Sequence, residues 1–306
     1  MTRYSFLLIF PALLVGCGQS NDAPAEVDAP APAAAVAAAP SASELLAAAL
    51  AAQPDEVRAR YQYRHPQETI EFFGVEPGMT VVEGLPGGGW YTRALLPYLG
   101  TDGAIIGADY SLDLYPLFNF VNEEFMAKQR QWTSTFAVDA VEWAGDDGAA
   151  VKGAFHFGSM PEELAETADV VLMIRALHNL ANFENAGEGA FLTAALADAY
   201  RILKPGGVLG VVQHEAREDM SDDFANGTRG YLKKSFVIQR AQAAGFEFVA
   251  ESDINKNAKD QPGDDDIVWR LPPTYGTSGD SEEMRAQMDA IGESNRMTLK
   301  FVKATN

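Results

Sequence analysis

Residues 74–89 read GVEPGMTVVEGLPGGG, and this stretch decides the fold. Its Pro77-Gly78 pair predicts a turn into the run 79–83, whose β-branched residues are typical of a short buried strand. Three glycines, at 87, 88 and 89, follow almost at once. Residues 90–99 then show the apolar spacing of a helix. A strand that leads through a glycine turn into a helix indicates an α/β domain.

The alternation of strands and helices continues to the C-terminus. Further strands are predicted at residues 104–108, 151–157, 169–174, 208–212, 246–250 and 297–302. Helices are predicted at residues 45–53, 55–63, 67–73, 118–131, 191–203 and 235–244. This order predicts a doubly wound, mostly parallel sheet of seven strands, Rossmann-like in class, with helices on both faces. The last strand follows another strand without a crossover helix, so we expect it to pair antiparallel.

Two acidic residues lie at strand ends, where ligands of open α/β sheets bind. Glu83 ends the first predicted strand, and its glycine turn offers free N–H groups at a helix N-terminus, which favour a carboxylate. Asp109 ends the next strand, 26 residues later, where its carboxylate can accept hydrogen bonds from both hydroxyls of a ribose. Together they indicate a cofactor that contains adenosine. The alternative for Glu83 is a carboxylate that only caps N–H groups of the turn.

These residues resemble the first motif of class I S-adenosylmethionine-dependent methyltransferases, which the segments 74–83 and 86–91 carry. The sequence LKPGG at 203–207 is similar to the turn before the fifth strand of many of these enzymes. RALHN at 175–179 and NRM at 295–297 resemble a narrower group of predicted bacterial methyltransferases, many of them exported. The resemblance covers roughly residue 61 to the C-terminus, and it implies a methyltransferase sheet with S-adenosylmethionine as the cofactor.

The resemblance also assigns residues to the cofactor. Glu83 would organise the turn near the amino-acid end of the cofactor, the glycines would line that end, and Asp109 would hold the ribose. The cofactor-binding candidates are Glu83, Pro86, Gly87, Gly88, Gly89, Asp109, Tyr110 and Arg175.

This sequence departs from the family at two positions. Leu85 replaces the usual first glycine, and His156 lies in the stretch where many relatives have an acidic residue for the adenine amine. Because Pro86 favours an extended residue before it, we expect Leu85 to pack inward against the sheet.

Two of the four histidines follow predicted strands, so both can face one pocket. A neutral histidine can take a proton from a hydroxyl or amine acceptor at pH 7. His178 with Asn179 is the first catalytic candidate, and His214 with Glu215 is the second. The alternative for each histidine is a hydrogen-bonded structural role. No group of His, Cys and acidic residues shows the spacing of a metal site, so no metal is expected.

An aromatic and basic stretch precedes the decisive segment. Residues 61–64 read YQYR, and His65 follows before a proline. The stretch can fold over the cofactor as a lid, or its helix can pack against the sheet.

The N-terminus predicts export and lipidation. A short basic start and the apolar run 4–15 end in Leu14-Val15-Gly16-Cys17, which resembles a bacterial lipobox. Cys17 is the only cysteine of the chain. We therefore expect a signal peptide at 1–16, a lipidated Cys17 with an Ala/Pro-rich tether at 17–43, and one domain at 44–306. An ordinary cleaved signal peptide is the alternative. The expected location is the periplasmic face of the envelope, and Gly18 in place of Asp favours the outer membrane.

The excess of acidic over basic residues limits the kinds of partner that the protein can bind. The 43 acidic residues outnumber the 23 basic ones, which argues against nucleic acid as a partner. The leading hypothesis is a methyltransferase that acts on a small-molecule acceptor and meets the membrane only through its lipid anchor. Since the cofactor is made in the cytoplasm, the alternative is a non-catalytic binding or scaffold lipoprotein of the envelope with the same fold. A nicotinamide dehydrogenase is excluded, because its glycine pattern is absent.

Overall fold

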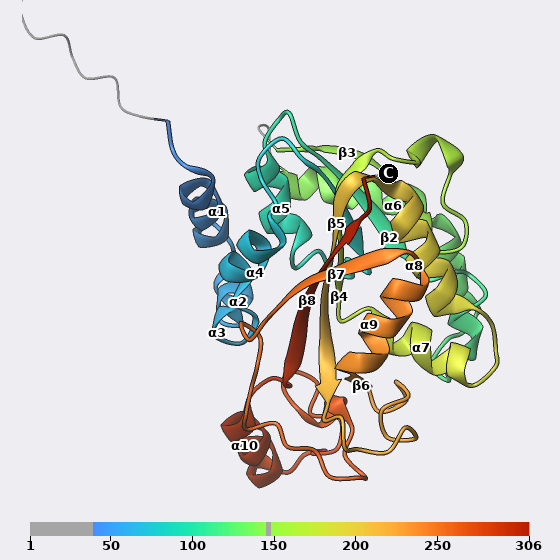
Figure 1. Cartoon of the computed structure of the whole chain (residues 1–306). Coiled ribbons are helices and arrows are strands. Elements are labelled where there is room, and N and C mark those ends of the chain that lie inside the picture. The colour runs from blue at the N-terminus through green and yellow to red at the C-terminus, as the bar shows by residue number, and fades with distance from the viewer. Residues whose placement is uncertain (1–38, 145–147, 306) are drawn as a thin grey trace, which may run out of the picture. The chain divides into compact units, whose positions relative to one another are not determined.

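A twisted β-sheet lies at the centre of the chain in the computed structural model, which describes residues 39–144 and 148–305 (Figure 1). Seven of its strands follow the order β3-β2-β1-β4-β5-β8-β7, and a two-residue strand, β6, pairs with β5. The strands are β1 Thr80–Gly84, β2 Ala104–Asp109, β3 Ala150–His156, β4 Ala168–Ile174, β5 Leu203–Ala216, β6 Leu232–Lys233, β7 Phe246–Ser252 and β8 Arg296–Lys303.

The strand directions confirm the predicted architecture. Strands β3, β2, β1, β4 and β5 run parallel, and β8 is antiparallel to both β5 and β7. The chain order reverses between β1 and β4, which pair in parallel from Val81 opposite Val170 to Gly84 opposite Met173. The crevice beyond the carboxyl ends of β1 and β4 is therefore the place where such a sheet binds ligands.

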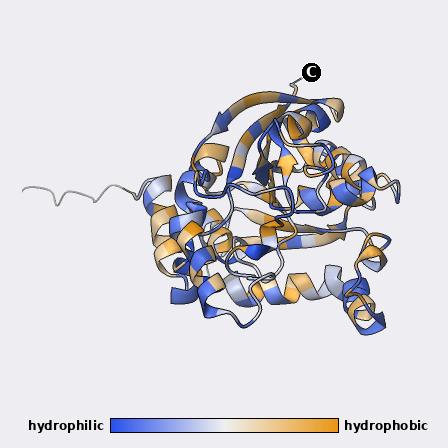
Figure 2. Cartoon of the chain, turned by 90° about the horizontal axis from the view of Figure 1, so that it is seen from below, coloured by the Kyte–Doolittle hydropathy of each residue, from blue (hydrophilic) through white to orange (hydrophobic). Residues whose placement is uncertain are grey.

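Helices cover both faces of the sheet. They are α1 Ala42–Ala51, α2 Asp55–Arg58, α3 Tyr61–Arg64, α4 Pro66–Phe73, α5 Thr92–Leu99, α6 Glu123–Ala144, α7 Leu177–Asn185, α8 Phe191–Ile202, α9 Lys234–Ala243 and α10 Glu282–Ile291. Helices α1, α4 and α5 share one buried apolar cluster with β1 and β2, whereas α7, α8 and α9 share the other with β4 and β5. The helices carry both hydrophobic and hydrophilic residues, as expected for elements that bury one face only (Figure 2).

Some predicted helix boundaries are wrong. The helix predicted at 118–131 begins at Glu123 and continues to Ala144, because Asn122 caps its first turn by accepting a hydrogen bond from the Phe125 amide at 2.9 Å. The helix predicted at 55–63 is two short helices, α2 and α3. Helix α1 begins at Ala42, inside the predicted tether, where Ser41 and Glu44 form a reciprocal capping box.

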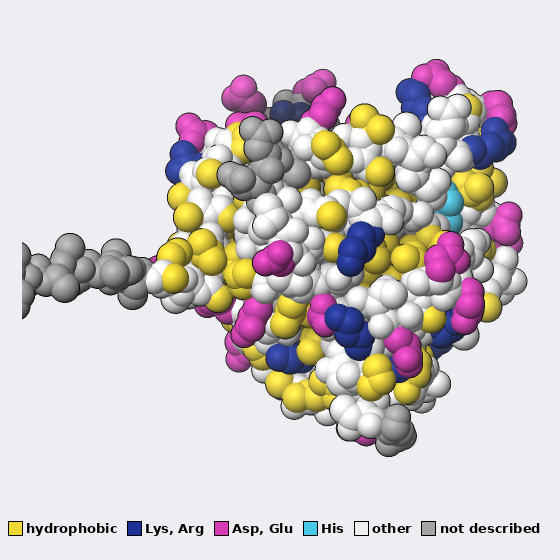
Figure 3. Space-filling view, turned by 90° about the horizontal axis from the view of Figure 1, so that it is seen from above, with side chains coloured by type: hydrophobic (Ala, Val, Ile, Leu, Met, Phe, Trp, Pro, Cys, Tyr) yellow, Lys and Arg dark blue, Asp and Glu magenta, His cyan; other side chains and the backbone are white. Residues whose placement is uncertain are grey.

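The predicted anchor lies almost wholly outside the described residues. Residues 1–38, which include the predicted signal peptide and Cys17, are not described, and Pro40–Asn306 forms one compact unit. Within the described residues, no helix is long and apolar enough to cross a bilayer. Acidic side chains are spread among apolar and uncharged ones on the face shown in Figure 3, in keeping with the net charge of −20.

Candidate functional site

A cleft of about 680 Å³ opens at the carboxyl ends of β1 and β2. Its volume lies within the range of small-molecule sites. The residues that line it come from these strand ends, from α6 and the segment before it, from α7 and from two later loops. They are Leu85, Gly87, Asp109, Tyr110, Tyr115, Leu117, Phe118, Asn119, Phe120, Gln129, Asn179, Asn182, Phe183, Thr228 and Trp269.

Asp109 lies in this cleft at the end of β2, as predicted. Its carboxylate accepts hydrogen bonds from the Tyr110 amide at 2.7 Å and from the Tyr115 hydroxyl. Burial raises the pKa of Asp109, and these two hydrogen bonds oppose the rise. A carboxylate has about four acceptor sites, so two donors leave capacity for the hydroxyls of a ligand.

Aromatic side chains form the walls of the cleft. Tyr110 contacts Phe118 with ring centroids 6.0 Å apart, and Phe118 meets Phe183 edge-on at 5.1 Å. Asn179 donates a hydrogen bond from Nδ2 to the Tyr110 hydroxyl at 3.0 Å, which holds both side chains at the wall. The cleft therefore offers flat apolar surfaces beside one carboxylate, which suits a base attached to a ribose.

The three glycines of the turn have different roles. Gly87 lines the cleft with φ of +54°, a conformation that favours glycine. Gly88 has open space around it, and a Cβ there would meet nothing within 4 Å. A Cβ on Gly89 would lie 2.2 Å from the Trp143 ring of α6, so this glycine serves close packing between elements. Gly88, Gly89 and the buried Pro86 do not line the cleft.

Leu85 differs from its predicted conformation. The residue has φ of +56°, in the left-handed region, whereas an extended conformation was expected before Pro86. The turn explains the difference, because the Leu85 amide donates to the carbonyl of Ala108 at 2.7 Å and so turns the chain over the end of β2. Its side chain packs against the buried core and also lines the cleft. The predicted inward packing is therefore only one of two positions that the Leu85 side chain covers, because it also borders the cleft.

Glu83 stays buried beneath the turn and is not a cleft residue. Its Oε2 accepts a hydrogen bond from the Thr92 hydroxyl at 2.6 Å, which joins the end of β1 to the first turn of α5. Burial raises the pKa of Glu83 to about 7, and the hydrogen bond from Thr92 only partly opposes this. Its hydrogen bond therefore joins β1 to α5, and its predicted role in organising the glycine turn stays a prediction.

The two candidate histidines come together, but away from Asp109. Their rings lie 5.4 Å apart, and the ring of His178 meets Trp269 edge-on at 5.7 Å. His178 lies 3.4 Å from Gln213 Oε1 through Nδ1, and His214 lies 2.6 Å from Ser294 Oγ through Nδ1. Burial lowers the pKa of His178 to about 4 and that of His214 well below its ordinary value, so both are neutral at pH 7. Neither lines the cleft, whereas Asn179 does.

A second, smaller cavity of about 140 Å³ lies on the other side of Trp269, which lines both. Its polar walls include Arg175, His214, Ser294 and Arg296. Arg175 follows β4 with φ of +58°, and its amide donates to the carbonyl of Val212 at 2.6 Å. The family resemblance assigned Arg175 to the cofactor site. In the structure, Arg175 lines this second cavity and does not line the cleft.

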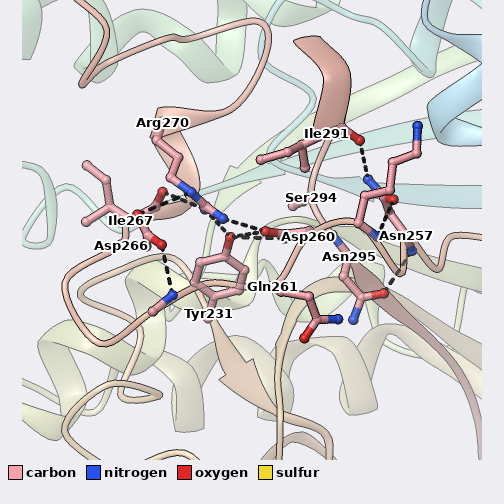
Figure 4. Close-up of polar contacts among 12 residues, drawn as sticks. Tyr231, Asn257, Asp260, Gln261, Asp266, Ile267, Arg270, Ile291, Ser294 and Asn295 are labelled. Carbon is pink, nitrogen blue, oxygen red and sulfur yellow. Dashed lines mark hydrogen bonds and ion pairs between the residues drawn. The ribbon is translucent and has the colours of Figure 1, made fainter. Parts of the chain in front are cut away.

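A buried polar network fixes the loop that carries Trp269 (Figure 4). Arg270 donates to Asp260 Oδ1 at 2.7 Å and to the Tyr231 hydroxyl at 2.8 Å, and that hydroxyl lies 3.0 Å from Asp260 Oδ2. Asp260 Oδ2 also accepts from the Asn295 amide at 2.9 Å.

The same network reaches the wall of the second cavity. Asn257 donates to the carbonyls of Ile291 and Glu293 at 2.9 and 2.6 Å, which holds the segment that bears Glu293 and Ser294 (Figure 4). The separation between the two cavities is thus built from a fully hydrogen-bonded core.

Sequence reasoning missed most of the cleft walls. Trp269 lies in the loop between β7 and α10, and neither periodicity nor a motif marks it. Phe118 and Phe120 were assigned to a helix that begins later. In the 61–64 segment, Arg64 is buried and stacks over Trp90 at 4.5 Å, so this segment packs against the domain and does not line the cleft. Among the described residues, no group of three His, Cys, Asp or Glu side chains could hold a metal ion.

Comparisons with known proteins give distant structural likenesses. No family model matches the chain, and no curated protein matches it. The (4+2)-cyclase SpnF is 15% identical and has a TM-score of 0.47 over 88% of this chain and 98% of its own. YcgJ of Bacillus subtilis is 15% identical, with a TM-score of 0.45 over 79% and 99%. A SAM-dependent methyltransferase from Aquifex aeolicus is 17% identical, with a TM-score of 0.43 over 66% and 93%. Because these likenesses are distant, we infer the function from the residues of the cleft.

Proposed function

We propose that the protein is an S-adenosylmethionine-dependent methyltransferase that acts on a small molecule. One observation carries this proposal: Gly87 of the first motif and Asp109 at the end of the next strand line one cleft with aromatic walls. The combination fits a nucleoside with a charged amino-acid end. The carboxylate of Asp109 would hold the ribose hydroxyls, and the aromatic rings would enclose the base.

The chain's own residues would then position the reactants. When bound, the cofactor supplies an activated methyl group, and in-line transfer depends chiefly on how the acceptor is held. Asn179 is one of the amide side chains that line the cleft, and its hydrogen bond to the Tyr110 hydroxyl fixes its position. The ring of His178 packs edge-on against Trp269, and His214 lines the second cavity, where its neutral imidazole can form a hydrogen bond to the acceptor.

Calorimetric titration with S-adenosylmethionine and S-adenosylhomocysteine tests the proposal. Asp109→Ala should weaken the affinity for both at least about tenfold, because a hydrogen bond to a charged group contributes roughly 1.5–3 kcal/mol. Asp113→Ala, which removes an exposed carboxylate outside the cleft, is the matched control and should bind like the wild type. Equal affinity in the wild type and in Asp109→Ala would refute the ribose contact.

A specific observation favours the second candidate function, a non-catalytic binding protein of the envelope. Leu85 occupies part of the cleft where the family has glycine. If neither nucleoside binds to the wild type but Leu85→Gly restores binding, the non-catalytic function is the better account.

We also propose that lipid on Cys17 holds the domain at the periplasmic face of the outer membrane. The lipobox-like sequence that ends at Cys17 supports this. Stable anchoring takes more than one acyl chain, so a diacylated or triacylated cysteine is expected. Cys17→Ser should move the protein from the membrane fraction to the soluble fraction. An unmodified cysteine in the intact mass of the purified wild type would contradict the anchor.

A further inference from the structure

Three arginines pair with one carboxylate at the second cavity, and a fourth arginine lines the same cavity. Glu293 accepts a hydrogen bond from Arg60 Nε at 2.7 Å, lies 3.4 Å from Arg64 Nε, and also pairs with Arg296. Although burial alone would raise it, the pKa of Glu293 lies below its ordinary value because of Arg296, Arg64 and Arg60. The negative charge of Glu293 is thus balanced by these three arginines.

Arg175 is the fourth guanidinium, and within the described residues it has no ion pair of its own. It lines the cavity beside Arg296, His214 and Ser294, and the Glu293 carboxylate that Arg296 pairs with lines the cavity as well. Burial, together with the neighbouring charges of Arg64 and Arg296, lowers the pKa of Arg175 to about 9. At pH 7 the group is nevertheless cationic.

This local charge balance is unusual for the chain. Buried charges in proteins are normally paired, because desolvation is costly. Here Glu293 pairs with three arginines, of which Arg60 is partly exposed, and Arg175 adds a fourth positive charge, although the whole chain has a net charge of −20. The neutral His214 adds a hydrogen-bonding group without adding to the positive charge. An anion in the cavity would complete the balance, and the guanidinium fork matches the two oxygens of a carboxylate or phosphate.

We propose that the second cavity binds an oxyanionic group, a carboxylate or phosphate, of the methyl acceptor, with Arg175 as its main contact. A volume of about 140 Å³ suits one small group and not a nucleoside. None of the turn glycines lines the cavity, whose walls come from the end of β4, from β5, from the loop around Trp269, and from β8 with the segment before it. The oxyanion therefore belongs to a molecule other than the one held at Gly87. The acceptor assignment rests on the proposed function, whereas the oxyanion site does not.

Thermal unfolding and calorimetry with malonate and inorganic phosphate test the site itself. At equal ionic strength, both anions should raise the melting temperature of the wild type above its value in chloride. Arg175→Met should bind them at least about tenfold more weakly, since charge-assisted bonds to the guanidinium are lost. Arg175→Lys keeps the charge but not the fork and should fall between the two. Arg201→Met removes a surface charge outside the cavity and should bind like the wild type.

The same variants locate the source of the oxyanion. S-adenosylhomocysteine should bind equally to the wild type and to Arg175→Met if the site serves the acceptor. A tenfold loss in Arg175→Met, absent when 5′-methylthioadenosine replaces S-adenosylhomocysteine, would assign the site to the cofactor's own carboxylate and overturn the acceptor assignment. No specific effect of malonate or phosphate on the wild type would overturn the site. Failure of the wild type to bind any nucleoside would instead refute the proposed function and leave the anion result standing.

Discussion

Two glutamates of this domain are almost equally buried, but their pKa values shift in opposite directions. The side chain of Glu83 is 5% exposed and that of Glu293 is 3% exposed. Glu83 has one hydroxyl partner, Thr92, and burial raises its pKa to about 7. Glu293 has three arginine partners that lower its pKa despite burial. The difference shows that counter-charge, and not burial alone, decides whether a buried carboxyl is ionised.

The comparison also separates two kinds of ligand region. Near Glu83, the turn after β1 is almost free of net charge and opens into an aromatic cleft with Asp109. Around Glu293, positive charge exceeds negative charge beside a small polar cavity. A region of the first kind suits a nucleoside, and one of the second kind suits an anion. Trp269 divides them and is held by the network around Arg270.

The largest effect is expected when the counter-charge of the arginine cluster is removed. Glu293→Gln leaves Arg64, Arg296 and Arg60 without their common partner. Removal of one partner of a buried ion pair typically lowers the free energy of unfolding by about 3–5 kcal/mol. Urea unfolding at pH 7 measures this change. Glu162→Gln, which breaks an exposed pair with Arg201, should cost less than about 1 kcal/mol.

The same unfolding experiment in the presence of phosphate tests whether the cavity binds an anion. If the cavity accepts an oxyanion, phosphate should restore more stability to Glu293→Gln than to Glu162→Gln at equal ionic strength. Equal loss in the two glutamine variants would mean that the buried pairs contribute no more than the surface pair, and that the excess of positive charge is not a strong local feature.

The strand-end residues of the first region could be predicted from the sequence, whereas Arg175 and His214 of the second region were predicted only for other roles. A glycine turn after a strand and an acidic residue at the next strand end are local patterns, so Gly87 and Asp109 were found from sequence positions alone. The strand order could also be predicted, because alternation and short turns leave few topologies.

The second region is assembled from distant parts of the chain. Arg64 and Glu293 are 229 residues apart in sequence, and Trp269 comes from a loop without a periodic pattern. Such contacts depend on where the loop between β7 and α10 packs. The left-handed conformation of Leu85 was also beyond reach, since the local preference before proline is overridden by the hydrogen bond to Ala108.

A smaller effect, visible as a pH dependence, is expected at Glu83. A carboxyl whose pKa rises from 4.5 to about 7 on folding contributes stability that is complete below pH 4.5 and is lost as the pH rises towards 7. Glu83→Gln removes this dependence. The stability of the variant relative to the wild type should therefore grow by about 3 kcal/mol between pH 4.5 and 8. Urea unfolding of both proteins across this range measures it.

A second variant checks the cause of that pH dependence. Thr92→Val removes the hydrogen bond that opposes the effect of burial, so the window in which stability is lost should move to higher pH. A difference between Glu83→Gln and the wild type that stays constant with pH would show that Glu83 ionises as an exposed glutamate does, and the contrast with Glu293 would fail.

The smallest effect concerns Leu85, the residue where the turn departs from the methyltransferase pattern. Leu85→Ala and Leu85→Gly both remove the side chain that lines the cleft, but only glycine adopts φ of +56° without strain. A non-glycine residue in the left-handed region costs roughly 1–2 kcal/mol, partly offset by the greater freedom of glycine in the unfolded chain. Leu85→Gly should therefore be more stable than Leu85→Ala by about 1 kcal/mol in urea unfolding. Equal stability would mean that the turn relaxes and that the hydrogen bond to Ala108 does not fix it. A gain in S-adenosylhomocysteine affinity in both variants would show that Leu85 obstructs the cleft, which favours the non-catalytic function.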